Sequence, residues 1–226
     1  MEKEEIQSAL QKAKDISGKR NFKQSFDLVI NLKGLDMKKQ ENNIDVFITL
    51  PHARGRKAKV CAMVGAELIG QARSICDFVI ISDDFEKYKE KKEIKKLAAE
   101  YDFFIAQANI MPKVATAFGN VFGPRGKMPN PKSGGVVPPN SSLKPLYEKL
   151  QRTIRATNKT APVIQCAIGT EDMKLNDVAE NAMTVYDSII HALPNEKHNI
   201  KNIYIKLTMG KPVKVGEKLE AVKETR

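Results

Sequence analysis

The sequence has no tryptophan, only three cysteines and only three histidines. The cysteines are far apart and set among apolar neighbours, which is typical of buried, reduced thiols in an intracellular protein. A zinc site needs clustered ligands, such as a Cys-x-x-Cys pair, and the sequence has no such cluster. These observations argue against a metal cofactor and against a disulfide-stapled secreted fold. The residues concerned are Cys61, Cys76, Cys166, His52, His191 and His198.

Long hydrophobic runs are also missing. No stretch of about 18 apolar residues is present, so the sequence predicts no transmembrane helix. The N-terminal segment MEKEEIQSALQKAK is charged from residue 2 and lacks the apolar core of a signal peptide. We therefore expect a cytoplasmic protein that is not delivered to a membrane.

Acidic residues are too few to balance the basic ones. The 226-residue chain has 38 lysines and arginines against 27 acids, a net charge of +11. Such a surplus attracts polyanions at long range, and the usual partners are nucleic acid and anionic membrane. Because nothing supports membrane delivery, the charge favours nucleic acid.

Both ends of the chain show alternating apolar and polar residues, which is typical of half-buried strands. The alternation covers residues 26–33, 44–50 and 203–209, and VIQCAIG near residue 163 is a further strand. Helical spacing is found over residues 3–17 and 174–193. Half-exposed strands need partners, and the nearest partners are each other. We therefore expect one discontinuous α+β domain, formed by residues 1–64 and 155–226.

The middle of the chain has a different pattern. Continuous apolar runs, KVCAMV, DFVII and DFFIAQ, alternate with segments of helical character, including residues 84–99, 111–118 and 143–156. Continuous apolar strands separated by helices indicate a parallel sheet covered on both faces. Residues 65–154 are therefore predicted to form an inserted, doubly wound α/β domain, with the two crossings near residues 60–68 and 153–160.

One segment, Gly119–Asn140, is rich in proline, glycine and positive charge. Its 22 residues contain five of the eleven prolines, five of the thirteen glycines, three cations and no carboxylate. Proline fixes φ and lacks a backbone donor, and glycine permits unusual turns. The composition predicts neither helix nor regular strand, but a shaped basic loop suited to phosphate. A proline-rich connector remains the alternative.

The order of residues in this segment supports a family resemblance. GPRGKMPNPKSGGVVPP, together with RNFKQSFDLVINL near the N-terminus and IYIKLTMGKPVKV near the C-terminus, resembles the ribosomal protein L-one family, the protein of the large subunit's mobile side stalk. The three segments occur in the family's order and span nearly the whole chain. The sequence around Lys127 and from Val136 to Pro139 is similar to that of archaeal members.

The resemblance implies both a fold and a function. It implies a principal RNA-binding domain made from both termini and an inserted Rossmann-like domain. It also implies binding to the large-subunit rRNA side stalk, assistance in release of exit-site tRNA, and repression of translation through binding to the protein's own mRNA. The protein is then a ribosome-associated component, not an enzyme, without a cofactor and monomeric outside the ribosome.

The family's RNA contacts correspond to residues on two strands of this chain, and a third strand extends the surface. Apolar side chains face sugars or bases, hydroxyls exchange hydrogen bonds with 2′-hydroxyls, and a carboxylate adds selectivity at a cost in charge repulsion. By pattern alone, Met209 is a core residue, Asp27 a solvent-facing acid and Phe22 a helix cap. The expected contacts are Phe22, Ser25, Asp27, Thr208, Met209 and Gly210, with Gln165 and Gly169 continuing the same surface.

Lysines near the C-terminal strand are expected to contact phosphates, which positions RNA without specifying its sequence. These are Lys201, Lys206, Lys211 and Lys214. A second basic group is Arg125, Lys127 and Lys132. Two interpretations of that group stay open, namely contact with RNA or tRNA, and packing of the loop across its own domain.

Two other functions are possible. One is an enzyme acting on a phosphorylated substrate, for which the best support is Gly123-Pro-Arg-Gly126-Lys127. This segment does not fit a Walker loop, because Val121 replaces the first glycine of that motif and Met128 follows the lysine. The first apolar run of the middle segment leads into a single Gly65, not a Gly-x-Gly-x-x-Gly motif. A general basic RNA-binding protein outside the ribosome explains the charge, but not the three ordered segments.

Overall fold

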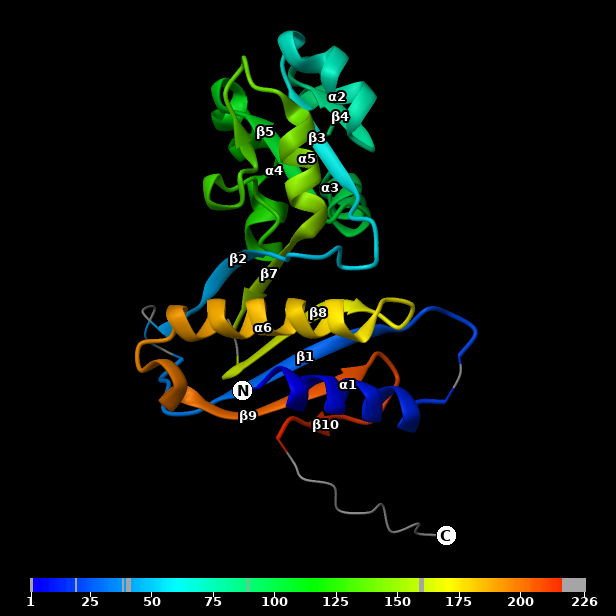
Figure 1. The fold of residues 1–226 in the computed structure, drawn as a ribbon. Coiled ribbons are helices and arrows are strands. Elements are labelled where there is room, and N and C mark those ends of the chain that lie inside the picture. The colour runs from blue at the N-terminus through cyan, green and yellow to red at the C-terminus, as the bar shows by residue number, and fades with distance from the viewer. Residues whose placement is uncertain are drawn as a thin grey trace. The chain divides into compact units, whose positions relative to one another are not determined.

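The computed structural model describes residues 2–18, 20–37, 39, 42–88, 90–158 and 161–216. Helices and strands in several sheets give a mixed α/β protein (Figure 1). Backbone proximity divides the chain into two compact units. Unit 1 is Met1–Arg56 with Ile154–Arg226, and unit 2 is Lys57–Thr153.

Unit 1 contains a four-stranded antiparallel sheet in the order β10-β9-β1-β8. Strand β1 (Ser25–Leu32) pairs with β8 (Val163–Thr170) on one side and with β9 (Ile200–Leu207) on the other. Segments from the two ends of the chain thus pair with each other, as the alternating pattern of the sequence predicted. The short edge strand β10 (Val213–Lys214) was not foreseen from the sequence.

Two helices cover one face of this sheet. Helices α1 (Lys3–Ile16) and α6 (Leu175–Ala192) lie on the same side of the strands (Figure 1). They pack there because one face of each is apolar, as with Ile6 and Leu10 of α1. These side chains meet Phe26, Leu28 and Ile30, whose alternation with polar neighbours places them on a single face of β1.

The strand before unit 2 and the strand after it form a separate pair. Strands β2 (Asp45–Thr49) and β7 (Thr153–Thr157) make a two-stranded sheet, in which Nε of Arg155 donates to Asp45 at 2.6 Å. Helix α5 (Leu143–Arg152) ends where β7 begins. The predicted helix over residues 143–156 is therefore too long, because residues 153–157 include three β-branched side chains that favour a strand.

Unit 2 is built on a parallel sheet in the order β4-β3-β5-β6. Its strands are β3 (Val60–Val64), β4 (Phe78–Ile81), β5 (Phe103–Gln107) and β6 (Val136–Val137). Helices α3 (Lys91–Glu100) and α4 (Met111–Arg125) pack on one face. The other face is covered by α2 (Ile69–Ile75) and α5. Short 3₁₀ turns complete the fold: η2 (Ala66–Leu68), η3 (Ser82–Lys87), η4 (Ala108–Ile110), η5 (Pro131–Ser133) and, in unit 1, η6 (Glu196–Asn199).

The apolar runs of the middle segment do form the covered parallel sheet that the sequence predicted. The position of residues 60–64 differs from the prediction, which assigned them to the terminal domain. All five residues of β3 are buried, and the strand pairs with both β4 and β5. A strand buried on both faces belongs inside the parallel sheet, so β3 lies within unit 2.

The prediction for Gly119–Asn140 is wrong in part. Helix α4 continues to Arg125 because Phe118, Val121 and Phe122 are buried at helical spacing, and this burial outweighs the nearby glycines. Pro124 is tolerated in the last turn, and Gly126, with φ of 65°, ends the helix. Strand β6 then pairs in parallel with β5. Only parts of the segment are irregular.

Candidate nucleic-acid interface

The turn Thr208–Gly210 follows β9 directly and is fastened to the start of β1. The Thr208 backbone N–H donates to the carbonyl of Ser25 at 3.1 Å, and the Thr208 hydroxyl accepts from the Ser25 N–H at 3.0 Å. The Gly210 N–H donates back to Leu207 at 2.9 Å. The hydroxyl of Thr208, expected to bond to RNA, thus serves first to hold the turn in place.

A buried glutamine also holds the backbone of this turn. The side chain of Gln24 is 1% exposed; its Nε2 donates to the Ser17 hydroxyl at 3.2 Å, and its Oε1 accepts from the Met209 backbone N–H at 3.2 Å. Its backbone N–H donates to the Glu171 carboxylate, and its carbonyl accepts from the Glu171 N–H. Gln24 therefore joins the end of α1, the segment after β8 and the turn after β9. The sequence analysis missed it, because a single glutamine between Phe22 and Ser25 carries no pattern.

Three large apolar side chains stand exposed on these joined segments. Within the described part of the chain, the exposed large hydrophobic residues are Ile16 at 48%, Phe22 at 50% and Met209 at 62%. Exposed apolar side chains gathered on neighbouring segments mark a surface for a partner. The core placement that the alternation suggested for Met209 is wrong, because β9 ends at Leu207 and the turn redirects the chain.

Gly210 is favoured by tight packing within the turn. A Cβ at this position would lie 3.3 Å from the Leu207 Cβ and 3.4 Å from the Ser17 Cβ. The close fit against the end of α1 leaves little room for a side chain, so the glycine shapes the turn itself.

Asp27 and Ser25 lie on the sheet face that the helices leave uncovered. Asp27 stands opposite Lys206 in register and is partly exposed. Burial raises the pKa of the Asp27 carboxyl above its ordinary value, and the positive charge of Lys206 opposes that rise. Gln165 is exposed on the same face of β8, opposite Val29.

Gly169 does not continue this surface, and its expected placement is wrong. A Cβ at Gly169 would come within 2.8 Å of Val178 in α6, so the residue faces the helices. The cause is a β-bulge, since Phe26 pairs with Gly169 but Asp27 pairs with Ala167. The extra residue, Ile168, reverses the alternation from Gly169 onward.

The lysines of β9, the turn and β10 lie at different distances from these groups. Lys211 follows the turn and Lys206 stands opposite Asp27, whereas Lys201 lies at the far end of β9. Lys201 and Lys211 are exposed, and Lys206 and Lys214 are partly exposed. Nearby, Lys23 pairs with Asp172 at 2.6 Å, and Lys14 donates to the carbonyl of Glu171 at 3.2 Å. The end of unit 1 that carries Phe22 and Met209 is thus apolar at its centre, with both lysines and acids around it.

The second basic group is largely engaged within unit 2. Nη1 of Arg125 donates to the carbonyl of Lys95 at 3.0 Å, and Nζ of Lys127 donates to the carbonyl of Tyr101 at 2.6 Å. These carbonyls lie along and just beyond α3, where a positive charge complements the helix dipole. Burial lowers the pKa of Lys127. Of the two interpretations, packing across its own unit fits Arg125 and Lys127, while Lys132 is exposed.

The crevice where doubly wound folds bind nucleotides is filled here by a side chain. That crevice lies at the carboxyl ends of β3 and β5, where the strand order reverses. Gln107 is 1% exposed and accepts from the Gly65 N–H at 2.8 Å, while its Nε2 donates to Glu67 at 3.0 Å. The Gln107 side-chain amide occupies the Gly65 N–H, which is the hydrogen-bond donor that a phosphate would need. The negative charge of the Glu67 carboxylate would also repel a phosphate.

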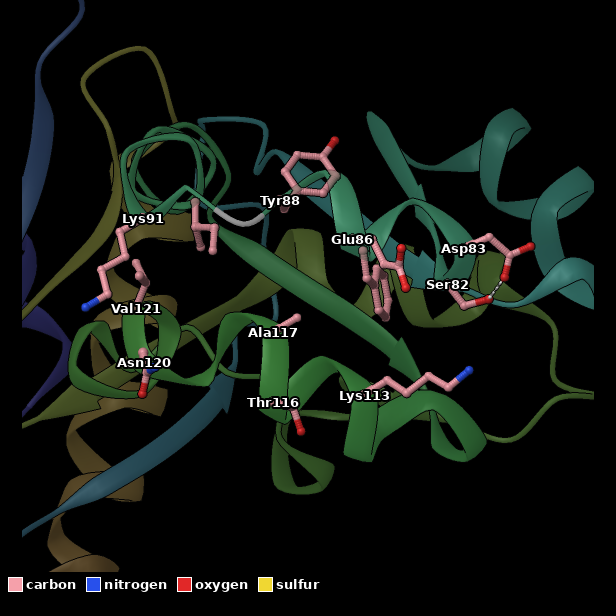
Figure 2. A pocket seen from close by; sticks show the side chains of 12 residues that line it. Ser82, Asp83, Glu86, Tyr88, Lys91, Lys113, Thr116, Ala117, Asn120 and Val121 are labelled. Atoms are coloured by element: carbon pink, nitrogen blue, oxygen red, sulfur yellow. Dashed lines mark hydrogen bonds between the residues drawn. The ribbon is translucent and has the colours of Figure 1, made fainter.

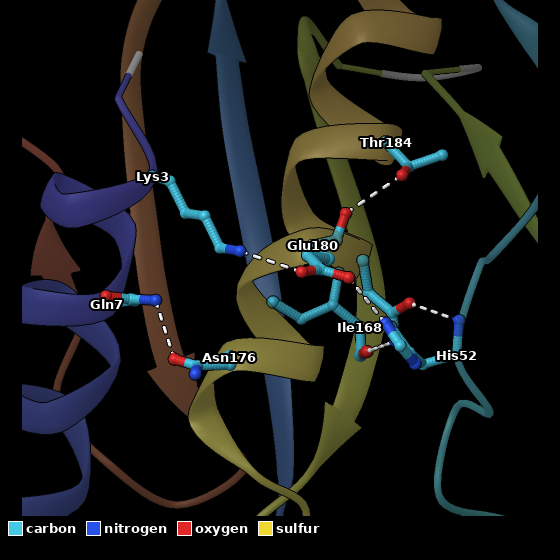
Figure 3. Close-up of polar contacts among 8 residues, drawn as sticks. Lys3, Gln7, His52, Ile168, Asn176, Glu180 and Thr184 are labelled. Atoms are coloured by element: carbon cyan, nitrogen blue, oxygen red, sulfur yellow. Dashed lines mark hydrogen bonds and ion pairs between the residues drawn. The ribbon is translucent and has the colours of Figure 1, made fainter.

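A polar cluster in unit 1 fastens α1 and the segment after β2 to α6. Glu180 accepts from Nζ of Lys3 at 2.8 Å and lies 2.7 Å from Nε2 of His52 (Figure 3). Hydrogen bonds from Lys3, and then from His52, lower the pKa of Glu180 to about 2. Asn181 accepts from the His52 N–H and donates to the carbonyl of Ile168. The cluster stabilises the helix layer behind the interface.

Unit 2 also has an open hollow of about 680 Å³ between η3, α3 and α4 (Figure 2). Its apolar floor includes Phe85 and Ile94, and its rim mixes acids such as Glu86 with Lys91 and Lys113. Across the described ranges, no three His, Cys, Asp or Glu side chains gather in a way that could hold a metal ion. Nor do those ranges contain a helix long and apolar enough to cross a membrane.

Comparison with known proteins places this sequence in a family. The family described as "Ribosomal protein L1p/L10e family" matches residues 10–211. The chain belongs to the ribosomal protein L1p/L10e family. The match includes β1, β8, β9 and the Thr208–Gly210 turn, so it spans the surface described above.

Individual relatives of this family match over nearly their whole length. Proteins named large ribosomal subunit protein uL1 are 41% identical in Methanothermobacter thermautotrophicus, over 94% of this chain and 99% of the relative. The protein of that name in Pyrococcus abyssi is 39% identical over 95% and 96%, and that in Thermofilum pendens is 41% identical over 89% and 88%. These organisms are archaea, which confirms the resemblance to archaeal members. The shared name is that of a ribosomal protein, not of an enzyme.

Proposed function

We propose that this protein is a structural constituent of the large ribosomal subunit that binds the rRNA of the mobile side stalk through unit 1. The observation that carries the proposal is the exposure of Phe22 and Met209 on segments that Gln24 holds together. A large exposed methionine on a hydrogen-bonded turn serves a partner, because burial inside the fold does not explain it. The net charge of +11 and membership of a ribosomal family make RNA that partner.

Each exposed group has a defined chemical role in this proposal. Phe22 and Met209 pack against sugars or bases, and the Ser25 hydroxyl exchanges hydrogen bonds with a 2′-hydroxyl. Asp27 accepts from a 2′-hydroxyl or a guanine edge, which favours one RNA over another. Gln165 extends the polar surface, and Lys206 and Lys211 bind phosphates. Thr208 and Gly210 act by shaping the turn that presents Met209.

We also propose that the two compact units are separate domains, with unit 2 inserted into an α+β domain made from both termini. The inserted domain is Rossmann-like in having a doubly wound parallel sheet, with the strand order 2-1-3-4 within the unit, but Gln107 occupies its nucleotide crevice. A ribosomal role places the protein in the cytoplasm, on ribosomes. Assistance to exit-site tRNA release belongs to the same proposal and rests on the family resemblance.

Repression of translation follows if one site serves two RNAs. A single interface in unit 1 that binds both rRNA and the protein's own mRNA makes the two compete. Free protein then represses its own synthesis only when rRNA is saturated. We also propose that the free protein is a monomer.

The alternative is a general basic RNA-binding protein outside the ribosome. It is favoured by net charge alone, whereas the ordered turn at Met209 favours a specific target. A phosphate-substrate enzyme is disfavoured by Gln107 and Glu67 in the crevice.

Reconstitution tests the proposed function. Large subunits stripped of their own side-stalk protein are mixed with this protein and sedimented. We expect stoichiometric rebinding, weakened by Met209→Ala, and retained by a variant whose residues 57–153 are replaced by a short linker. Failure of the unaltered protein to bind stripped subunits would remove the ribosomal assignment. If only the shortened variant fails to bind the stripped subunits, the assignment of rRNA binding to unit 1 is wrong.

A further inference from the structure

The uncovered face of the unit 1 sheet carries an ordered set of side chains beyond the residues discussed so far. In antiparallel strands, residues directly opposite each other point to the same face. Leu28, Ile205 and Cys166 are opposite one another and face the helices. The residues one position away therefore face outward, where none of the helices described in unit 1 covers them.

Tyr204 lies at the centre of this outward face. It stands opposite Val29 in β1 and opposite Lys214 in β10, and Val29 in turn stands opposite Gln165 in β8. The four side chains form one row across the sheet, about 14 Å long at the usual strand spacing. Tyr204 is partly exposed, and it is absent from the apolar core that the helices complete.

Rows of a different chemistry lie on either side of Tyr204. On one side, Asn202 stands opposite Asn31; on the other, Lys206 stands opposite Asp27. All four residues are partly exposed. Amide groups offer a donor and an acceptor together, which is the pattern of a base edge, and lysine offers a phosphate contact. The face thus combines the Tyr204 ring, several amides, and lysines that accompany the Asp27 carboxylate.

We propose that this face is a platform for unpaired RNA bases, with the ring of Tyr204 stacking on a base and Asn31, Asn202 or Gln165 contacting base edges. The inference rests on the proposed function and deepens it, since it defines a single-stranded part of the RNA target. Continuity supports it, because Asp27 lies on the same face and the Thr208–Gly210 turn continues from β9.

A paired RNA helix does not suit this surface. Bases in an A-form duplex are stacked on one another, and the deep major groove excludes side chains, so an exposed ring finds no free base face. Unpaired bases have free faces and free Watson–Crick edges. Stacking on an aromatic side chain also tolerates any base, so the amides supply the selectivity.

The test uses the full chain and a side-stalk rRNA fragment with 2-aminopurine at one unpaired position after another. We expect the fluorescence of at least one position to be quenched on binding, because stacking on an aromatic ring quenches this base analogue. Tyr204→Leu should remove the quenching and weaken binding about tenfold or more, whereas Tyr204→Phe, which keeps the ring, should bind within about twofold of the unaltered protein.

Tyr147→Leu is the matched control, because Tyr147 is a partly exposed tyrosine in α5 of unit 2. Its substitution should leave both affinity and quenching unchanged. If Met209→Ala weakens binding while Tyr204→Leu changes nothing, the platform is refuted and the proposed RNA site stands. If the unaltered protein shows no preference for the fragment over scrambled RNA, the proposed function fails, and the platform fails with it. Equal losses for Tyr204→Leu and Tyr204→Phe would also contradict stacking.

Discussion

The buried amide of Gln24 accepts a hydrogen bond from the backbone N–H of Met209 at 3.2 Å, although 185 positions separate the two residues in the chain. The contact connects the residue just before β1 to the turn just after β9. A group that is 1% exposed thereby fixes the backbone of a residue that is 62% exposed. The fold thus fixes the backbone that carries the most exposed apolar side chain of the surface, and this makes the position of Met209 specific.

Gln24→Leu is expected to weaken both the fold and RNA binding. The substitution leaves the Ser17 hydroxyl and the Met209 N–H without their partner, which should lower the free energy of unfolding by about 1–3 kcal/mol. RNA affinity should fall as well, measured at a temperature where the variant remains folded. Gln11→Leu, at an exposed position of α1, serves as control and should change neither quantity much. Reduced stability with unchanged affinity would make Gln24 a core residue only.

Met209→Ala is expected to separate binding from stability. Because the side chain is exposed, its truncation should change the free energy of unfolding by no more than about 0.5 kcal/mol. Affinity for the stalk RNA should fall about tenfold, since an apolar contact with a sugar or base is lost. Denaturant unfolding and RNA titration of the same preparation check both parts. An unchanged affinity would contradict a role for the turn in binding.

Thr208→Val and Thr208→Ser should differ. Valine keeps the shape but removes the hydroxyl that accepts from the Ser25 N–H, so the turn loosens and both stability and specific binding decrease, stability by about 1 kcal/mol. Serine keeps the hydroxyl and should retain most of both. If the two variants bind alike, the hydrogen bond to Ser25 does not position the turn.

The lowered pKa of Glu180 predicts how the stability of the fold changes in acid. Its pKa in the folded protein is about 2, below the ordinary value of 4.5, so its contacts with Lys3 and His52 stabilise the fold above about pH 4.5. That contribution is lost as the pH falls from about 4.5 toward 2. Glu180→Gln should therefore show a shallower loss of stability across this range in urea unfolding at stepped pH. Glu148→Gln, at an exposed position of α5, is the control and should follow the unaltered protein.

Much of the fold could be predicted from local pattern. The alternation in β1 and β9 indicated half-buried strands, and the continuous apolar runs indicated a parallel sheet with both faces covered; both interpretations are confirmed. Such patterns work because side-chain burial repeats with the period of the element. Composition was a poorer guide, since Val121 and Phe122 kept α4 helical through a segment rich in glycine and proline.

The site was less predictable, because its geometry depends on distant contacts. Met209 is in phase with Leu207, but the strand stops between them, and Gly169 is in phase with Gln165, but a bulge reverses its face. Neither the end of β9 nor the bulge in β8 can be recognised from the types of the residues at those positions. The hydrogen bonds of Gln24 depend on three segments far apart in the chain, which no spacing rule relates.

The most direct test is a titration of the protein with a side-stalk fragment of large-subunit rRNA and with scrambled RNA of equal length, at two salt concentrations. Phosphate contacts by about four lysines should make log K fall with log salt at a slope of roughly −3 for both RNAs. We predict that preference for the stalk fragment persists at the higher salt, because the turn at Met209 and the polar groups of β1 do not depend on counterion release. Equal affinity for both RNAs, falling together with salt, would contradict a specific ribosomal RNA site.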